Sequence, residues 1–205
     1  MESASESDGS RGAKAILRSP TVIFSLVLVA VYIIIGAIVG NFFEPLLSGN
    51  IILDLLVQCD APTPIFPWTV LTAIFLHASI LHIASNVFFL LFFGFILEEQ
   101  VTKSRWVTTF IITGLVGSLG FVGYDVLGYL LSGGTPTIDC AVGASGAVYG
   151  IMGTAVGVKV VLLLIFLLGL DIFAGGGGPA HLGGLVAGLI LRRYWSLGGG
   201  TFRGI

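Results

Sequence analysis

Long runs of apolar residues dominate the chain and limit what it can fold into. Residues 22–40, 80–97 and 106–124 are each 18 or 19 residues long and carry no Asp, Glu, Lys or Arg. A helix rises about 1.5 Å per residue, so each run is long enough to cross a hydrocarbon core of about 30 Å. Hydrophobic residues make up 56% of the 205 residues and charged residues only 10%, whereas soluble domains carry roughly 25% charged residues. The sequence therefore predicts an all-α polytopic membrane protein.

Two further apolar stretches, 142–174 and 179–193, complete the predicted bundle. The first is too long for one crossing, and Lys159 falls near its middle. Because cytoplasmic loops retain Lys and Arg, we divide it at that lysine into spans 142–158 and 160–174. All nine cations then lie on one side of the membrane: Arg11, Lys14, Arg18, Lys103, Arg105, Lys159, Arg192, Arg193 and Arg203. This division predicts six spans with both termini cytoplasmic.

The inner loops between the spans are predicted to be short. The six-span core covers residues 21–194, between cytoplasmic tails at 1–20 and 195–205. Two outer loops are longer: 125–141, which carries Asp125, and 41–79, in which Trp68 is expected to anchor at headgroup level. The formal net charge is only −2, and no basic cluster suggests a nucleic acid partner. Cys59 and Cys140 fall in predicted outer loops, where a disulfide is permitted, and the sequence leaves their pairing open. No motif in the sequence suggests a metal or a cofactor.

Four polar residues inside the spans are candidates for function, because a polar group in hydrocarbon costs free energy unless it finds a partner. They are His82, Asn86, Ser145 and His181. With six spans they all lie in the first turns of spans that run inward, so they share one depth near the external face. His82 and Asn86 are four residues apart and therefore lie on one helical face.

Pairs of glycines four residues apart predict that two of these spans approach closely. Gly146 and Gly150 follow Ser145, and Gly184 and Gly188 follow His181. Small residues at this spacing allow helix backbones to come together in lipid. Such an approach would bring the serine within hydrogen-bond reach of the imidazole.

That proximity suggests acyl-transfer chemistry. A serine hydroxyl becomes a nucleophile when an adjacent base takes its proton, and neutral imidazole suits that task. The backbone N–H of Ser145, the Asn86 amide and the His82 ring could stabilise the oxyanion. No carboxylate shares the depth of His181, so we predict a Ser–His dyad without a third member.

Two neighbouring side chains have alternative interpretations. Tyr149, one turn after Ser145, either packs in the core or supports the His181 ring, and we favour the second. His77 lies five residues before His82 and is expected to point away from it, at the outer interface. For the whole set, the simpler alternative is that the polar groups only hold helices together.

The residues resemble the rhomboid family of intramembrane serine proteases in three blocks. These are residues 68–98, with His77, His82, Asn86 and Glu98; residues 143–150, GASGAVYG, beginning at Gly143; and residues 180–188, AHLGGLVAG. The resemblance implies that Ser145 is the nucleophile, His181 its base, and His82 with Asn86 the oxyanion-hole side chains, with Tyr149 against the base. It also implies a cell-membrane enzyme that cleaves transmembrane helices of membrane-protein substrates without metal or nucleotide, in a cavity open to the external side.

The chain departs from the family pattern in two places. It has Trp68-Thr69 where the family commonly has Trp-Arg, and residues 145–174 must supply two spans with almost no connection. Two other functions stay open: a catalytically impaired rhomboid-like protein that binds transmembrane helices, and a small transporter or proton channel with His82 and His181 as relay groups. The sequence does not indicate the oligomeric state.

Overall fold

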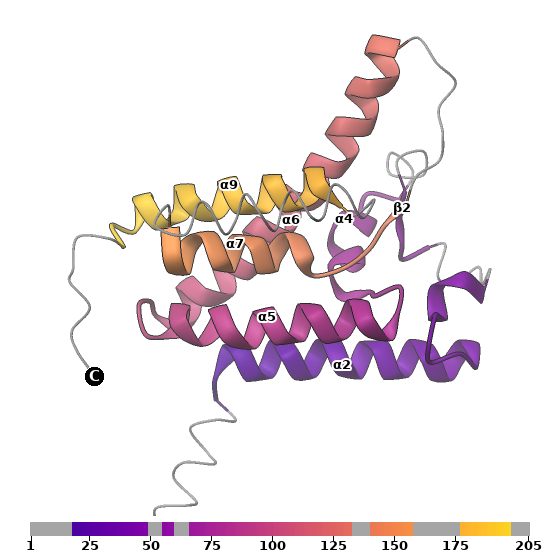
Figure 1. Ribbon diagram of the computed structural model, residues 1–205, viewed down its shortest axis with the longest axis horizontal. Coiled ribbons are helices and arrows are strands. Elements are labelled where there is room, and N and C mark those ends of the chain that lie inside the picture. Colours follow the sequence, from indigo (N-terminus) through magenta and orange to yellow (C-terminus); the bar gives the residue numbers. More distant parts are fainter. Residues whose placement is uncertain (1–17, 49–54, 60–65, 133–139, 158–176, 198–205) are drawn as a thin grey trace, which may run out of the picture.

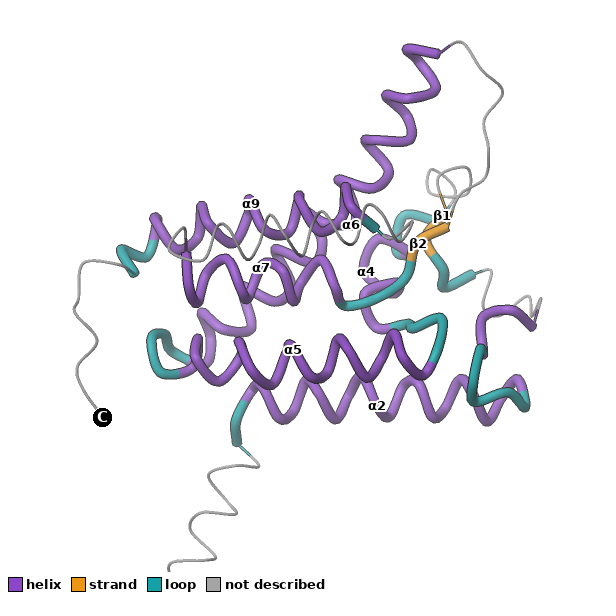
Figure 2. The backbone as a smooth tube through the Cα atoms, viewed as in Figure 1, coloured by secondary structure: helices purple, strands orange, loops and turns teal. Residues whose placement is uncertain are grey.

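The computed structural model describes residues 18–48, 55–59, 66–132, 140–157 and 177–197. Over these residues the longer helices form a bundle (Figure 1): α2 (Pro20–Val39), α5 (Ile80–Glu98), α6 (Lys103–Ser132), α7 (Ser145–Val156) and α9 (Gly178–Tyr194). The shorter elements are η1 (Pro45–Ser48), α4 (Thr69–Thr72), η2 (Ala73–Phe75), and the strands β1 (Gln58–Cys59) and β2 (Cys140–Ala141). Figure 2 shows both strands at one end of the bundle, which we call the strand end.

Local sequence signals set the ends of the first two apolar helices. Ser19 caps α2, its hydroxyl accepting from the N–H of Val22, and Pro20 occupies the first turn, a position that proline favours. Gly40 ends the helix in the left-handed conformation, with φ 70°. Ser79 caps α5 by accepting from the N–H of His82. Both helices therefore begin and end within two residues of the predicted spans.

Three of the described helices are long and apolar enough to cross a membrane: Pro20–Val39, Ile80–Glu98 and Lys103–Leu131. Their composition agrees with a multi-pass helical membrane protein. Helix α7 is apolar but only 12 residues long, which is about 18 Å of rise. The predicted fifth span, 160–174, lies outside the described residues.

Helix α6 is longer than predicted. The expected span ended at residue 124 and was followed by a loop over 125–141, but the helix continues to Ser132 and projects beyond its neighbours (Figure 1). Residues 125–132 contain three leucines and no proline, and leucine is a good helix former. A single Gly128 costs only about 1 kcal/mol in a helix, so it does not end this one.

The helices pack in an order that leads to one core. α6, α7 and α9 pack against one another, α5 packs on α7, and α2 packs on α5. Trp106 is fully buried and donates from its indole nitrogen to the carbonyl of Gly94 over 3.0 Å. Phe24 of α2 reaches the same region, with its ring centroid 5.3 Å from that of Trp106.

Polar contacts tie the helices together at the end opposite the strands. The Glu98 carboxylate accepts from the Ser19 hydroxyl at 2.6 Å and from the Thr21 N–H at 2.8 Å, so α5 helps to cap α2. Arg192 of α9 donates to the carbonyl oxygen of Thr154 at 2.6 Å and to that of Ala155 at 2.9 Å. A cation at these last carbonyls of α7 is favourable, because they carry partial negative charge.

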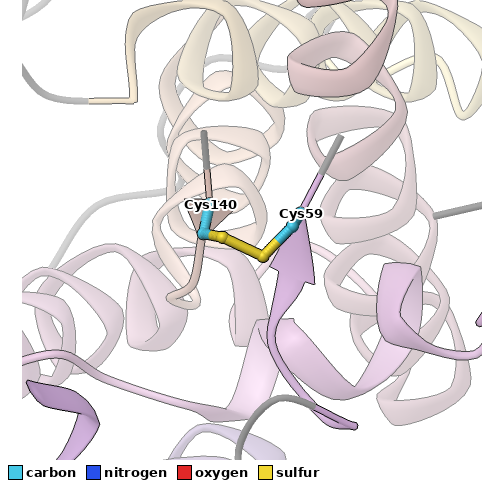
Figure 3. Close-up of a disulfide and its surroundings, with 2 residues drawn as sticks. All are labelled: Cys59 and Cys140. Carbon is cyan, nitrogen blue, oxygen red and sulfur yellow. A yellow bond between two sulfur atoms is a disulfide. The ribbon is translucent and has the colours of Figure 1, made fainter. Parts of the chain in front are cut away.

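A disulfide joins the two strands and answers the question that the sequence left open. The strands are antiparallel, with Gln58 opposite Ala141 and Cys59 opposite Cys140. The cysteines are bonded, with a Cα–Cα distance of 4.1 Å (Figure 3). Gln58 is 1% exposed and donates to the carbonyl oxygen of Ser118 on α6 over 2.9 Å. The outer loop is therefore fastened both to α6 and to the segment that leads into α7.

Candidate active site

Ser145 and His181 meet near the strand end, where their helices begin. Ser145 is the first residue of α7, and His181 lies in the first turn of α9. The hydroxyl oxygen of Ser145 lies 2.6 Å from Nε2 of His181. Ser145 is half-buried and His181 is 7% exposed. The pair thus forms one short hydrogen bond in a largely enclosed position.

The glycine pairs are the points at which α7 and α9 touch. A Cβ added to Gly184 would overlap the carbonyl group of Gly146, and one added to Gly188 would overlap that of Gly150. Thr154 joins the helices further along, with its hydroxyl donating to the carbonyl oxygen of Gly188 over 2.9 Å. Backbone therefore lies directly on backbone, as expected for small residues at this spacing, and this places the serine beside the imidazole.

Tyr149 lies against the imidazole. Its ring is stacked on that of His181, with centroids 4.5 Å apart and planes at 8°. The stack covers one face of the imidazole and leaves its edge to the serine. Tyr149 can therefore fix the plane of the ring without competing for Nε2.

His82 lies next to Gly143, two residues before the serine. Gly143 has φ 125°, and a Cβ there would be 2.7 Å from both Cε1 and Nε2 of His82 and 3.8 Å from the Ser145 hydroxyl oxygen. This position thus requires glycine for its backbone angle and for the space that the ring occupies. Asn86 is 4% exposed, and its amide nitrogen donates to the carbonyl oxygen of His82 over 2.9 Å. One of its two N–H bonds is therefore directed along its own helix.

The prediction for His77 is wrong. It is 2% exposed, its ring centroid is 5.1 Å from that of His82 at an interplanar angle of 68°, and its Nε2 accepts from the Ala144 N–H at 3.4 Å. His77 lies outside the membrane-spanning helices, and burial, aided by the neighbouring His82, lowers its pKa from 6.5 to about 3. The prediction assumed helical spacing between the two histidines. Helix α5 begins only at Ile80, so this spacing does not apply.

A small cavity opens beside the serine, on the side of α6. Its lining combines the residues around Ser145 with parts of β1, β2, α6 and α9. Two of these residues, Gln58 and Ser118, are polar and were not predicted, because they meet through a tertiary contact between the outer loop and α6. The predicted anchor Trp68 is 49% exposed and donates from its indole nitrogen to the carbonyl oxygen of Leu55 over 2.9 Å.

The fold and the site together define a multi-pass helical membrane protein in which a serine and a histidine on neighbouring helices are hydrogen-bonded to each other. The Rhomboid domain family matches residues 66–197, which is more than half of the chain. The chain therefore belongs to the rhomboid family. The matched segment contains Ser145 and His181 together with His77, His82, Asn86, Gly143 and Tyr149.

Curated relatives agree with this assignment. RHOMBOID-like protein 6, mitochondrial, of Arabidopsis thaliana is 32% identical over 140 residues, which are 60% of this chain and 42% of the relative. Rhomboid-like protease 3 of Toxoplasma gondii is 28% identical over 153 residues, which are 63% of this chain and 52% of the relative. RHOMBOID-like protein 1 of Arabidopsis thaliana is 29% identical over 140 residues, or 60% of this chain and 33% of the relative. The chain thus spans about a third to a half of the length of these relatives.

Proposed function

We propose that the chain is an intramembrane serine endopeptidase, with Ser145 as nucleophile and His181 as its base. The observation that carries this proposal is the 2.6 Å contact between the serine hydroxyl and Nε2 of the imidazole. A neutral imidazole at this distance can take the hydroxyl proton as the oxygen attacks a carbonyl carbon. The stacked Tyr149 keeps the ring in the plane that this transfer needs.

The attack produces a tetrahedral oxyanion, which needs hydrogen-bond donors. The N–H of Ser145 belongs to the first turn of α7, where N–H groups have no acceptor inside the helix. His82 lies beside Gly143, and Asn86 is the third donor that we assign to this oxyanion hole. His181 then gives its proton to the leaving amine, and a water activated by the same imidazole hydrolyses the acyl enzyme.

We also propose six membrane spans in the cell membrane, with both termini cytoplasmic and the site near the external face. Described cations lie at the end opposite the strands: Arg18, Lys103, Arg105, Arg192 and Arg193. A cytoplasmic location of that end agrees with the preference of positive charge for this side. The Cys59–Cys140 disulfide at the strand end supports the same orientation, because disulfides persist on the oxidising side of a membrane.

The proposed substrate is a transmembrane helix of another membrane protein. A helix conceals its carbonyl groups in its own hydrogen bonds, so the substrate must unwind locally before Ser145 can attack. We expect it to enter between spans, near the predicted fifth span, and to unwind at small residues. The cavity beside the serine is small and lies next to Gly143 and Ala180, which agrees with small side chains at the cleaved bond.

Cleavage of a reporter with one transmembrane segment, by purified protein in liposomes, tests the proposal. We expect Ser145→Ala to lower turnover by at least about 10³-fold, as loss of a nucleophile does. Ser25→Ala is the matched control, because Ser25 is a buried serine of α2, and it should cleave like wild type. Full activity of Ser145→Ala would refute the assignment of Ser145 as the nucleophile.

A fluorophosphonate probe separates the enzyme from the catalytically impaired alternative. The wild-type protein should react with the probe at Ser145, and His181→Ala should react far more slowly because the base is missing. A wild-type protein that binds the reporter but neither cleaves it nor reacts with the probe would instead be a binding protein. Ion flux through liposomes without proteolysis would indicate the transporter.

A further inference from the structure

His77 is a buried polar residue that contacts two parts of the site without belonging to the serine–histidine pair. It lies between η2 and α5 and is 2% exposed. Its Nε2 accepts from the N–H of Ala144, the residue before the serine, at 3.4 Å. Its ring meets that of His82 edge to face. No part of the mechanism above uses this residue.

An imidazole is a costly residue to place here unless its nitrogen is needed. Burying a polar group without a hydrogen bond costs free energy, whereas an apolar side chain of similar size would fill the same space at no such cost. Burial holds the pKa of His77 at about 3, so the ring is neutral at physiological pH. A neutral ring keeps a lone pair on one nitrogen, which is what the Ala144 N–H requires.

The contact with Ala144 acts together with a hydrogen bond of the preceding residue on the backbone that leads into α7. The N–H of Gly143 donates to the carbonyl oxygen of Ala73 over 2.9 Å, and the N–H of Ala144 is held by His77. These two successive peptides set the direction in which the next N–H, that of Ser145, leaves the helix. A change of acceptor at His77 would therefore alter the position of a proposed oxyanion donor.

The second contact concerns the His82 ring. Gly143 lies close to Cε1 and Nε2 of this ring, and the His77 ring is packed against it at an interplanar angle of 68°. The preferred edge-to-face geometry limits how the ring can turn. His77 thus contacts the backbone just before the Ser145 N–H, which belongs to α7, and the His82 ring, which belongs to α5.

We propose that His77 is a positioning residue that aligns the Ser145 N–H and the His82 ring on the same oxyanion. The proposal rests on the proteolytic function proposed above. It assigns His77 no contact with the substrate. It predicts that the acceptor nitrogen matters more than the volume of the ring.

Three substitutions separate the acceptor from the volume. His77→Gln places an amide oxygen about where Nε2 lies, His77→Asn carries the same group on a shorter side chain, and His77→Leu fills the space without an acceptor. With the reporter substrate we expect His77→Leu to lower kcat by about 10–100-fold, because a displacement of about 1 Å at a reacting centre can cost about 10²-fold. KM should change less than threefold, and His77→Gln should recover most of kcat. If His77 served only to fill space, His77→Leu would instead be at least as active as His77→Gln.

Amide hydrogen exchange tests the same inference independently of catalysis. Exchange at Ala144 and Ser145 should be at least tenfold faster in His77→Leu than in wild type, and close to wild type in His77→Gln. If His77→Leu does not fold, His77→Gln is compared with His77→Asn. The asparagine variant, with its shorter side chain, should then show the faster exchange and the lower kcat. Equal exchange and equal kcat in these variants would overturn the proposal. A wild-type protein without activity but with the expected exchange pattern would refute the proteolytic function and leave the positioning of this backbone standing.

Discussion

Replacement of Gly143 by alanine should disable the site while leaving the bundle folded. The new Cβ would lie 2.7 Å from Cε1 and Nε2 of His82, whereas ordinary contacts begin at 3.4 Å. The ring must therefore move by about 0.7 Å, the difference between these two distances. Since a misplacement of about 1 Å can cost about 10²-fold in rate, and one lost oxyanion donor about 10²–10³-fold, we expect Gly143→Ala to lower kcat by about 10²-fold.

The same substitution also strains the backbone, and a second glycine separates the two effects. Gly143 has φ 125°, and Gly40 has φ 70° but no atom within 4 Å of an added Cβ. Both alanine variants should lose stability, by about 1–3 kcal/mol for a residue held in a disfavoured backbone conformation. Only Gly143→Ala should lose activity on the reporter, measured as kcat beside the thermal midpoint of each protein in detergent. A kcat of Gly143→Ala within threefold of wild type, or an equal loss in Gly40→Ala, would refute the reasoning.

Two further predictions concern the contacts that hold the site in place. Gly188→Ala would drive a Cβ into the carbonyl group of Gly150 and should lower stability by about 1–3 kcal/mol, as overpacking does; Gly128→Ala, where nothing lies within 4 Å, should be neutral or stabilising in the same thermal unfolding measurement. Reduction of the Cys59–Cys140 disulfide, which spans a sequence separation of 81, should lower stability by about 2–4 kcal/mol. The double variant with serine at both positions should match the reduced protein and be insensitive to dithiothreitol, and a reductant effect of the same size in that variant would contradict the assignment.

The sequence predicted well those features that depend on composition along the chain. An apolar run of about 19 residues can hardly form anything but a membrane-length helix, so the bounds of α2 and α5 follow from the sequence to within two residues. The sequence also predicted one depth for Ser145 and His181, because the charge distribution assigned the same direction to their two spans, and both residues lie in the first turn of their helices. These inferences need no knowledge of which helices touch.

Features that depend on distances between segments could not be predicted in the same way. The pairing of Cys59 with Cys140 depends on two short strands that are 81 residues apart, and two-residue strands leave no alternating pattern. His77 was misplaced because a loop, not a helix, joins it to His82, and a loop has no fixed periodicity. The end of α6 was misplaced because the uncharged apolar run ends before Asp125, and the end of such a run does not have to be the end of the helix.

The contact between α7 and α9 also has an evolutionary consequence. In an ordinary core, a larger residue on one side can be accommodated by a smaller residue on the other, so that interacting positions change together. At Gly184 and Gly188 the side chain is already the smallest, and the nearest atoms that an added Cβ would meet are backbone atoms of Gly146 and Gly150. No partner substitution can make room, so these positions should be fixed independently in active relatives rather than covary. Methods that infer contacts from correlated substitutions would therefore find little signal at the helix contact on which the serine–histidine pair depends.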